Sequence, residues 1–120
     1  MPQQELFFEH RAGDWRVEVV KTYDRSYARE AFDAMDDAAR AHLWNALRID
    51  MNHETEDIPP RDTPDGEDFL WDELLDAARE DGNQLSFFVV NDSEASGSLY
   101  VSPDWPSAED FARSRIAAAQ

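Results

Sequence analysis

The sequence predicts an α+β fold: a small single domain with an antiparallel sheet of about four strands, arranged as two hairpins, and two to four helices packed on one face. The chain has 120 residues, and two domains of half that size would each be too small to bury a good core. Hydrophobic residues make up 42% of the chain, which is enough for one core. Segments with a period of two residues lie on either side of segments with a helical period. We therefore expect residues 1–120 to form one acidic domain.

The first hairpin is expected near the N-terminus. Residues 5–9 form a short candidate strand, and residues 11–13 can turn the chain. Residues 15–23 alternate, with Trp15 and Val17 among the apolar residues on one face and polar residues on the other. This alternation is typical of a strand that is buried on one side.

The next segment, residues 27–51, has the period of an amphipathic helix. Ser26 is positioned to cap its N-terminus. The pair Asp36-Asp37 predicts a break in this helix, because aspartate is a favoured capping residue and a second helix can begin there.

Residues 52–67 are expected to form an exposed acidic loop, because they contain three prolines, one glycine and many carboxylates. Residues 68–81 then predict a second helix, with Gly82 at its expected end. Its apolar stripe consists of Leu70, Trp71, Leu74, Leu75 and Ala78.

The second hairpin is expected from two β-rich segments, residues 85–90 and 98–102, of which the first is apolar enough for a central strand. A last helix follows Trp105-Pro106. Ser107 and Asp110 have the spacing of a capping box at its start.

The strongest compositional feature is the charge. Eleven basic residues minus 27 acidic residues give a net charge of −16. A chain of this charge repels nucleic acid and anionic lipid, and it attracts basic surfaces. We therefore expect a basic protein surface as the partner, without direct binding to nucleic acid or to a membrane.

Several features are absent from the sequence, and their absence limits where the protein is located and what chemistry it can carry out. The chain has no cysteine, which excludes disulfides and thiolate sites and fits a reducing compartment. The first residues lack the basic and apolar regions of a signal peptide, and no apolar run approaches the roughly 18 residues of a membrane span. These features predict a cytoplasmic protein.

The candidate binding site is a row of carboxylates in and before the second helix. Asp68, Asp72, Asp76 and Glu80 are spaced by four residues, so on a helix they lie along one side. The full set of candidate partner-binding residues is Asp65, Glu67, Asp68, Asp72, Glu73, Asp76 and Glu80.

Such a row can imitate backbone phosphates and occupy a Lys/Arg groove meant for nucleic acid. The leading hypothesis is therefore a non-enzymatic interaction protein that binds and blocks a basic surface. A phage inhibitor of nucleic-acid-targeting defence and an immunity protein against a nuclease toxin are proteins of this class. Their targets are nucleic-acid-binding proteins or nucleases.

Two alternatives stay open. Abundant aspartate and alanine with a single lysine also fit an ordinary cytoplasmic domain of a salt-adapted or GC-rich organism, in which the acidity names no partner. A small enzyme with a carboxylate site is the third hypothesis. No catalytic residue, metal ligand or cofactor is predicted, because His42 and His53 lack the spacing of known metal motifs.

The four tryptophans are expected to lie mostly in the core. Trp44 lies slightly off its helical stripe, and Trp105 lies in a loop beside Pro106. Either one is a candidate for an exposed interface anchor.

Overall fold

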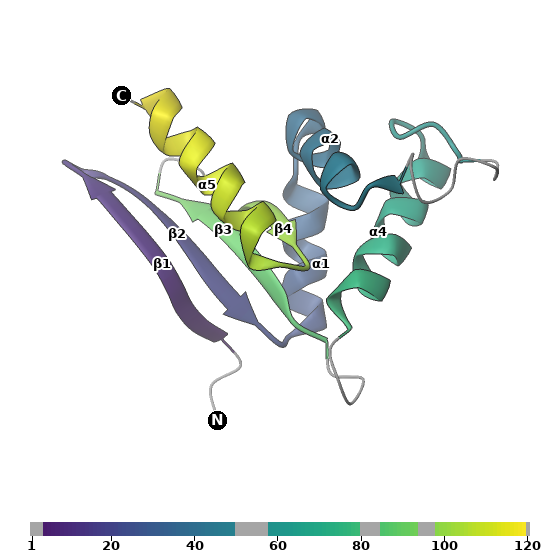
Figure 1. Cartoon of the computed structure of the whole chain (residues 1–120), viewed down its shortest axis with the longest axis horizontal. Helices are drawn as coiled ribbons and strands as arrows, with labels where there is room; N and C mark the ends of the chain where they lie inside the picture. Colours follow the sequence, from purple (N-terminus) through teal and green to yellow (C-terminus); the bar gives the residue numbers. More distant parts are fainter. Residues whose placement is uncertain (1–3, 50–57, 80–84, 94–97, 120) are drawn as a thin grey trace.

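A computed structural model describes residues 4–49, 58–79, 85–93 and 98–119 of the chain. Its fold is α+β, with a four-stranded antiparallel sheet in the order β1-β2-β3-β4 (Figure 1). The expected fold class is confirmed. The elements in chain order are β1 (Gln4–Ala12), β2 (Trp15–Thr22), α1 (Arg25–Ala34), α2 (Asp37–Ala46), α4 (Pro64–Ala78), β3 (Phe87–Asp92), β4 (Ser98–Ser102) and α5 (Trp105–Ala119).

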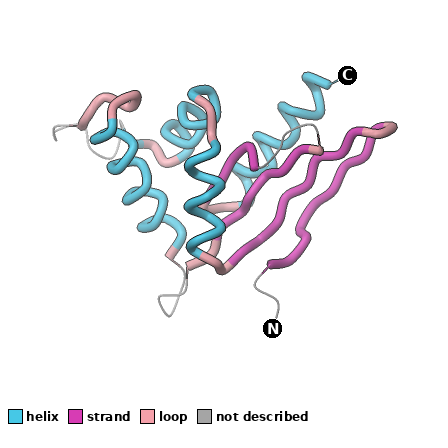
Figure 2. The backbone as a smooth tube through the Cα atoms, turned by 180° about the vertical axis from the view of Figure 1, so that it is seen from behind, coloured by secondary structure: helices cyan, strands magenta, loops and turns pink. Residues whose placement is uncertain are grey.

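The helices divide between the two faces of the sheet, rather than lying on one face as expected. Neighbouring residues of β3 point to opposite faces. Phe87 stacks on Trp71 of α4 with ring centroids 6.4 Å apart, and Phe88 contacts Trp105 of α5 at 6.1 Å. Figure 2 shows α1 on one side of the sheet and α5 on the other. The apolar run of β3 requires this arrangement, because a central strand that is apolar on both faces needs cover on both.

The first two helices are capped by aspartates. Asp24 accepts hydrogen bonds from the backbone N–H groups of Ser26 and Tyr27, so it takes the capping position expected for Ser26. The predicted break at Asp36-Asp37 is confirmed. Asp36 is the N-cap of α2, and its carboxylate accepts the N–H of Ala39 at 2.8 Å.

Helix α5 begins at Trp105, earlier than the expected capping box at Ser107 and Asp110. The carboxylate of Asp104 accepts the backbone N–H of Ser107 at 2.9 Å. Ser107 lies within the first turn, and its hydroxyl forms a hydrogen bond with the hydroxyl of Tyr100. The serine is therefore a packing contact between α5 and β4, and the aspartate takes the capping role.

Helix α4 also begins earlier than expected, at Pro64 rather than at residue 68. Thr63 is its N-cap, and proline suits the first helical turn because its missing N–H has no helical partner to lose. The end of the expected loop, residues 64–67, is therefore helical. Residues 50–57 and Gly82 lie outside the described residues.

A buried carboxylate joins α5 to the sheet. Asp92, the last residue of β3, has a fully buried side chain. It accepts a hydrogen bond from Nε1 of Trp15 at 2.9 Å and pairs with Nη2 of Arg115 at 3.0 Å. The expected strand ended at residue 90, and Asp92 lies beyond that end.

Within the ranges described, no helix has the length and the apolar composition needed to cross a bilayer. Among the expected interface anchors, Trp44 is buried, with 6% of its surface exposed. Trp105 is half-buried.

Candidate functional site

Helix α4 is oriented by its apolar side. Leu70, Trp71 and Leu74 are buried in the core. The ring of Trp71 contacts the rings of Phe32 in α1, at a centroid distance of 5.2 Å, and of Phe87 in β3. These contacts determine which side of α4 faces solvent.

The solvent side of α4 carries a row of four aspartates, which we call the acidic face: Asp65, Asp68, Asp72 and Asp76. All four are exposed. At about 100° per residue they fall within an arc of about 80°, opposite the buried leucines. Among the residues that the structure describes, none of the ion pairs involves any of these four. The helix lies at the end of the molecule away from β1 (Figure 1).

The charge density of α4 resembles that of a nucleic-acid strand. Its 15 residues include six carboxylates and no basic residue. With a rise of about 1.5 Å per residue, this gives one negative charge per roughly 3.8 Å of helix. A single strand of duplex DNA carries one per about 3.4 Å of axis. Two of the six carboxylates, Glu67 and Glu73, lie outside the acidic face, whose four aspartates alone are spaced by roughly 5.5 Å on average along the helix.

The other candidate residues differ in their surroundings. Glu67 is half-buried and faces Nη1 of Arg40 at 3.5 Å, so it points toward α2 rather than to the acidic face. Glu73 is half-buried on the flank of the helix and interacts with the rest of the protein. Glu80 lies outside the described residues. The structure thus brings four of the seven candidates together on one open surface.

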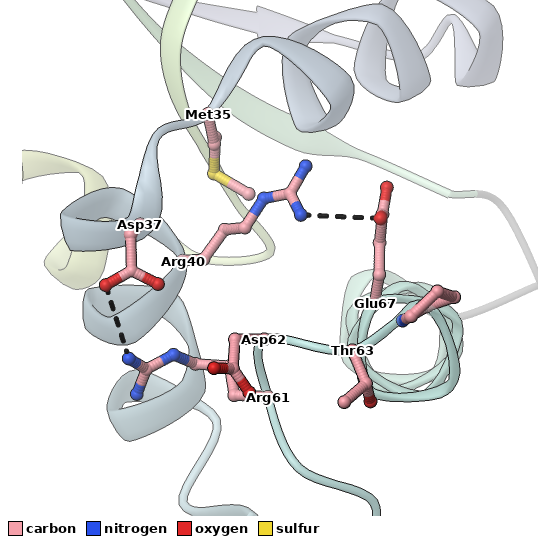
Figure 3. Close-up of a pocket in the computed structure, with 8 residues that line it drawn as sticks. Met35, Asp37, Arg40, Arg61, Asp62, Thr63 and Glu67 are labelled. Atoms are coloured by element: carbon pink, nitrogen blue, oxygen red, sulfur yellow. Dashed lines mark ion pairs between the residues drawn. The ribbon is translucent and has the colours of Figure 1, made fainter.

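A cavity of about 360 Å³ adjoins the N-terminal end of α4 (Figure 3). Two ion pairs line it, Arg40 with Glu67 and Arg61 with Asp37, each with an N–O distance of 3.5 Å. These distances exceed the 2.7–2.9 Å or so of a strong charge-assisted hydrogen bond. The Nε atoms of both arginines are buried without a hydrogen-bond partner in the described part of the chain. Sequence spacing gave no signal for this cavity, because its residues meet only through tertiary packing.

The wall of this cavity depends on a close approach at Gly66. A Cβ atom at this position would lie 1.9 Å from the carbonyl oxygen of Pro60 and 2.9 Å from Cα of Arg61. Both are backbone atoms, so the loop before α4 would have to move away from the helix. The Gly66→Ala variant is therefore expected to lose about 1–3 kcal/mol of unfolding free energy.

This loss is expected although alanine favours a helix interior over glycine by about 1 kcal/mol. Urea denaturation followed by circular dichroism measures the effect. An unchanged or increased stability of Gly66→Ala would contradict the close approach.

A second cavity, of about 540 Å³, lies between the C-terminal part of α2 and the start of α5. Nε2 of His42 is 3.5 Å from the exposed carboxylate of Asp110. The hydroxyl of Ser107 is hydrogen-bonded to Tyr100, and burial raises the pKa of Tyr100, so this phenol stays protonated. Among the described residues, no hydrogen bond joins Ser107 to His42.

In residues 4–49, 58–79, 85–93 and 98–119, no three histidine or acidic side chains gather closely enough to hold a metal ion. His53 lies outside the described residues. Comparisons with protein-family models, curated proteins and solved structures find no match to this chain.

Proposed function

We propose that this protein is a stoichiometric inhibitor that binds a basic surface of another protein through the acidic face of α4. The observation that carries the proposal is the row of exposed aspartates, which have no basic partner within the described part of the chain. The partner is a protein with a Lys/Arg groove, such as a nuclease or another nucleic-acid-binding protein. The acidic face takes the place of the phosphate backbone in that groove.

Repulsion within the row of aspartates destabilises α4, and this energetic cost supports a binding role for the row. Asp68, Asp72 and Asp76 are spaced by four, and like charges at this spacing each cost a helix a few tenths of a kcal/mol. A purely structural helix gains stability when lysine replaces some of these residues. The repulsion between these aspartates is relieved if another molecule supplies the positive charges, and this gives a physical reason for the row.

The uneven distribution of charge supports the proposal over a general acidity of the chain. Helix α5 has the same length as α4 but contains two acidic and two arginine residues, so its net charge is zero. Helix α4 has a net charge of −6. Acidity that served only solubility in salt has no need to be concentrated on one helix.

A charge-reversal variant of the acidic face tests the proposal. A tagged wild-type chain is used to capture a partner from host lysate at about 0.1 M salt, where attraction between charges still acts over about 10 Å. Bound protein is released by a salt step and identified by mass spectrometry. The partner's affinity for Asp72→Lys/Asp76→Lys is then expected to fall about 100-fold or more, because like charges now meet in the interface.

The matched control is Asp14→Lys/Glu30→Lys, which changes the net charge equally at exposed positions outside α4. It is expected to retain nearly full affinity. The lysine at position 72 also attracts Asp68, which lies four residues before it on α4, so the helix is expected to stay folded. Equal losses in both variants, or the absence of any basic partner at low salt, would refute the proposal.

A further inference from the structure

Strand β1 lies at one edge of the sheet, and no strand in the described part of the chain pairs with its outer side. It pairs with β2 and stands at the end of the sheet order, whereas β4 at the other end packs against α1 and α2. The outer backbone groups of an edge strand are free to pair with another chain. The two large hydrophobic side chains that are exposed in the described part of the chain, Leu6 (56%) and Phe7 (46%), both belong to β1.

A β-bulge divides β1 into two parts. The register with β2 shifts between Leu6 and Phe8, so Phe7 is the extra residue. As a result, the side chains of two consecutive phenylalanines contact the same residue, Trp105. The rings of Phe7 and Phe8 lie 4.8 Å and 5.9 Å from the ring of Trp105. Beyond the bulge, residues 8–12 pair regularly with β2 up to the hairpin turn.

The charges of this regular part are self-complementary. Glu9 and Arg11 lie two residues apart, so they point to the same face of the sheet. Nε of Arg11 donates a hydrogen bond to Glu9 at 2.8 Å, which lowers the pKa of Glu9 and keeps it charged near neutral pH. If two copies of this segment run antiparallel about a two-fold axis at His10, Glu9 of each copy lies opposite Arg11 of the other.

We propose that two copies of this chain associate through residues 8–12 of β1 and form one continuous antiparallel sheet. In this register Phe8 lies opposite Ala12 of the second copy. The half-exposed ring of Phe7 comes beside Gly13, a residue without a side chain. The small residues of the hairpin turn thus leave room for the exposed aromatic ring.

The charge distribution allows this association despite a net charge of −16 on each chain. Strands β1 and β2 together contain three acidic residues, two arginines and one lysine, so their net charge is zero. Helix α4, which carries the acidic face, lies at the opposite end of the molecule from β1 (Figure 1). Charges that are separated by more than the Debye length of about 8 Å at physiological salt are largely screened from each other. The two acidic faces therefore point away from each other in the dimer and remain free for other partners.

Sedimentation analysis over a range of protein concentrations tests the proposal on the intact chain. The wild-type chain is expected to reach the mass of a dimer. Arg11→Glu places four acidic residues in the interface and Glu9→Arg places four basic residues there. Each variant alone is expected to weaken the dimer about tenfold or more. Arg25→Glu, an equal charge change on α1, is the matched control and is expected to dimerise like the wild type.

Two experiments that restore opposite charges across the interface distinguish a specific loss of dimerisation from a general loss of folding. An equimolar mixture of Arg11→Glu and Glu9→Arg chains is expected to form a heterodimer. The double variant Glu9→Arg/Arg11→Glu is expected to dimerise again by itself. A wild-type chain that stays monomeric at millimolar concentration would overturn the proposal, as would folded single variants that fail to recover in both experiments.

Discussion

Replacing Trp71 by alanine is expected to lower the free energy of unfolding by about 3–5 kcal/mol. The side chain is 8% exposed and lies between Phe32 of α1 and Phe87 of β3. The guanidinium group of Arg29 lies over this ring, with its Cζ atom 5.1 Å from the ring centroid. Alanine leaves a large cavity at the point where α4 is joined to the rest of the core.

Chemical denaturation followed by circular dichroism measures this loss, and Trp71→Phe serves as the matched variant. Phenylalanine keeps an aromatic ring in the same place, so its loss is expected to be clearly smaller. Because Trp71 holds α4 against the core, the alanine variant is also expected to bind the proposed basic partner more weakly. A loss of stability below about 1 kcal/mol would show that Trp71 does not anchor the helix in the way described.

Replacing Asp92 by alanine is expected to cost about 3 kcal/mol of unfolding free energy. Its carboxylate is fully buried and accepts from Trp15 at 2.9 Å and from Arg115 at 3.0 Å. Removing it leaves the indole N–H and the guanidinium group without this acceptor. The side chain of Arg115 is 40% exposed, so water recovers part of the loss on that side.

Asp92→Asn separates the two contributions. The amide oxygen can still accept the indole N–H, but the charge that attracts Arg115 is gone, so we expect an intermediate stability. Arg115→Ala is expected to be destabilising as well, because it removes the guanidinium group that pairs with the buried carboxylate at 3.0 Å. If Asp92→Ala were as stable as the wild type, the carboxylate would not be the link between α5 and β3.

Local periodicity was sufficient to predict most elements of this fold. The alternation in residues 15–23 predicted β2, and the segment at 98–102 was located with the observed bounds. Asp36-Asp37 marked the break between α1 and α2, because capping depends on a few neighbouring residues. The same local rule placed Asp68, Asp72 and Asp76 on one side of α4, since a spacing of four defines one side of a helix. The structure added Asp65, because α4 begins at Pro64, and showed that this side is exposed.

Features that depend on distant residues could not be predicted in this way. The bulge at Phe7, the cavity beside Arg40 and Arg61, and the buried carboxylate of Asp92 all involve partners from other elements. The cap of α1 was assigned to Ser26 instead of Asp24, because both residue types favour that position and only the backbone geometry distinguishes them.

The sequence alone determined most element types, the charge and the four-residue spacing of Asp68, Asp72 and Asp76, because these properties repeat over a few residues. Tertiary structure alone decided that helices cover both faces of the sheet, that Glu67 turns toward Arg40 rather than joining the acidic face, and that β1 stands at one edge of the sheet. Those outcomes depend on which elements bury each other's apolar surfaces, and that choice is made by the core as a whole.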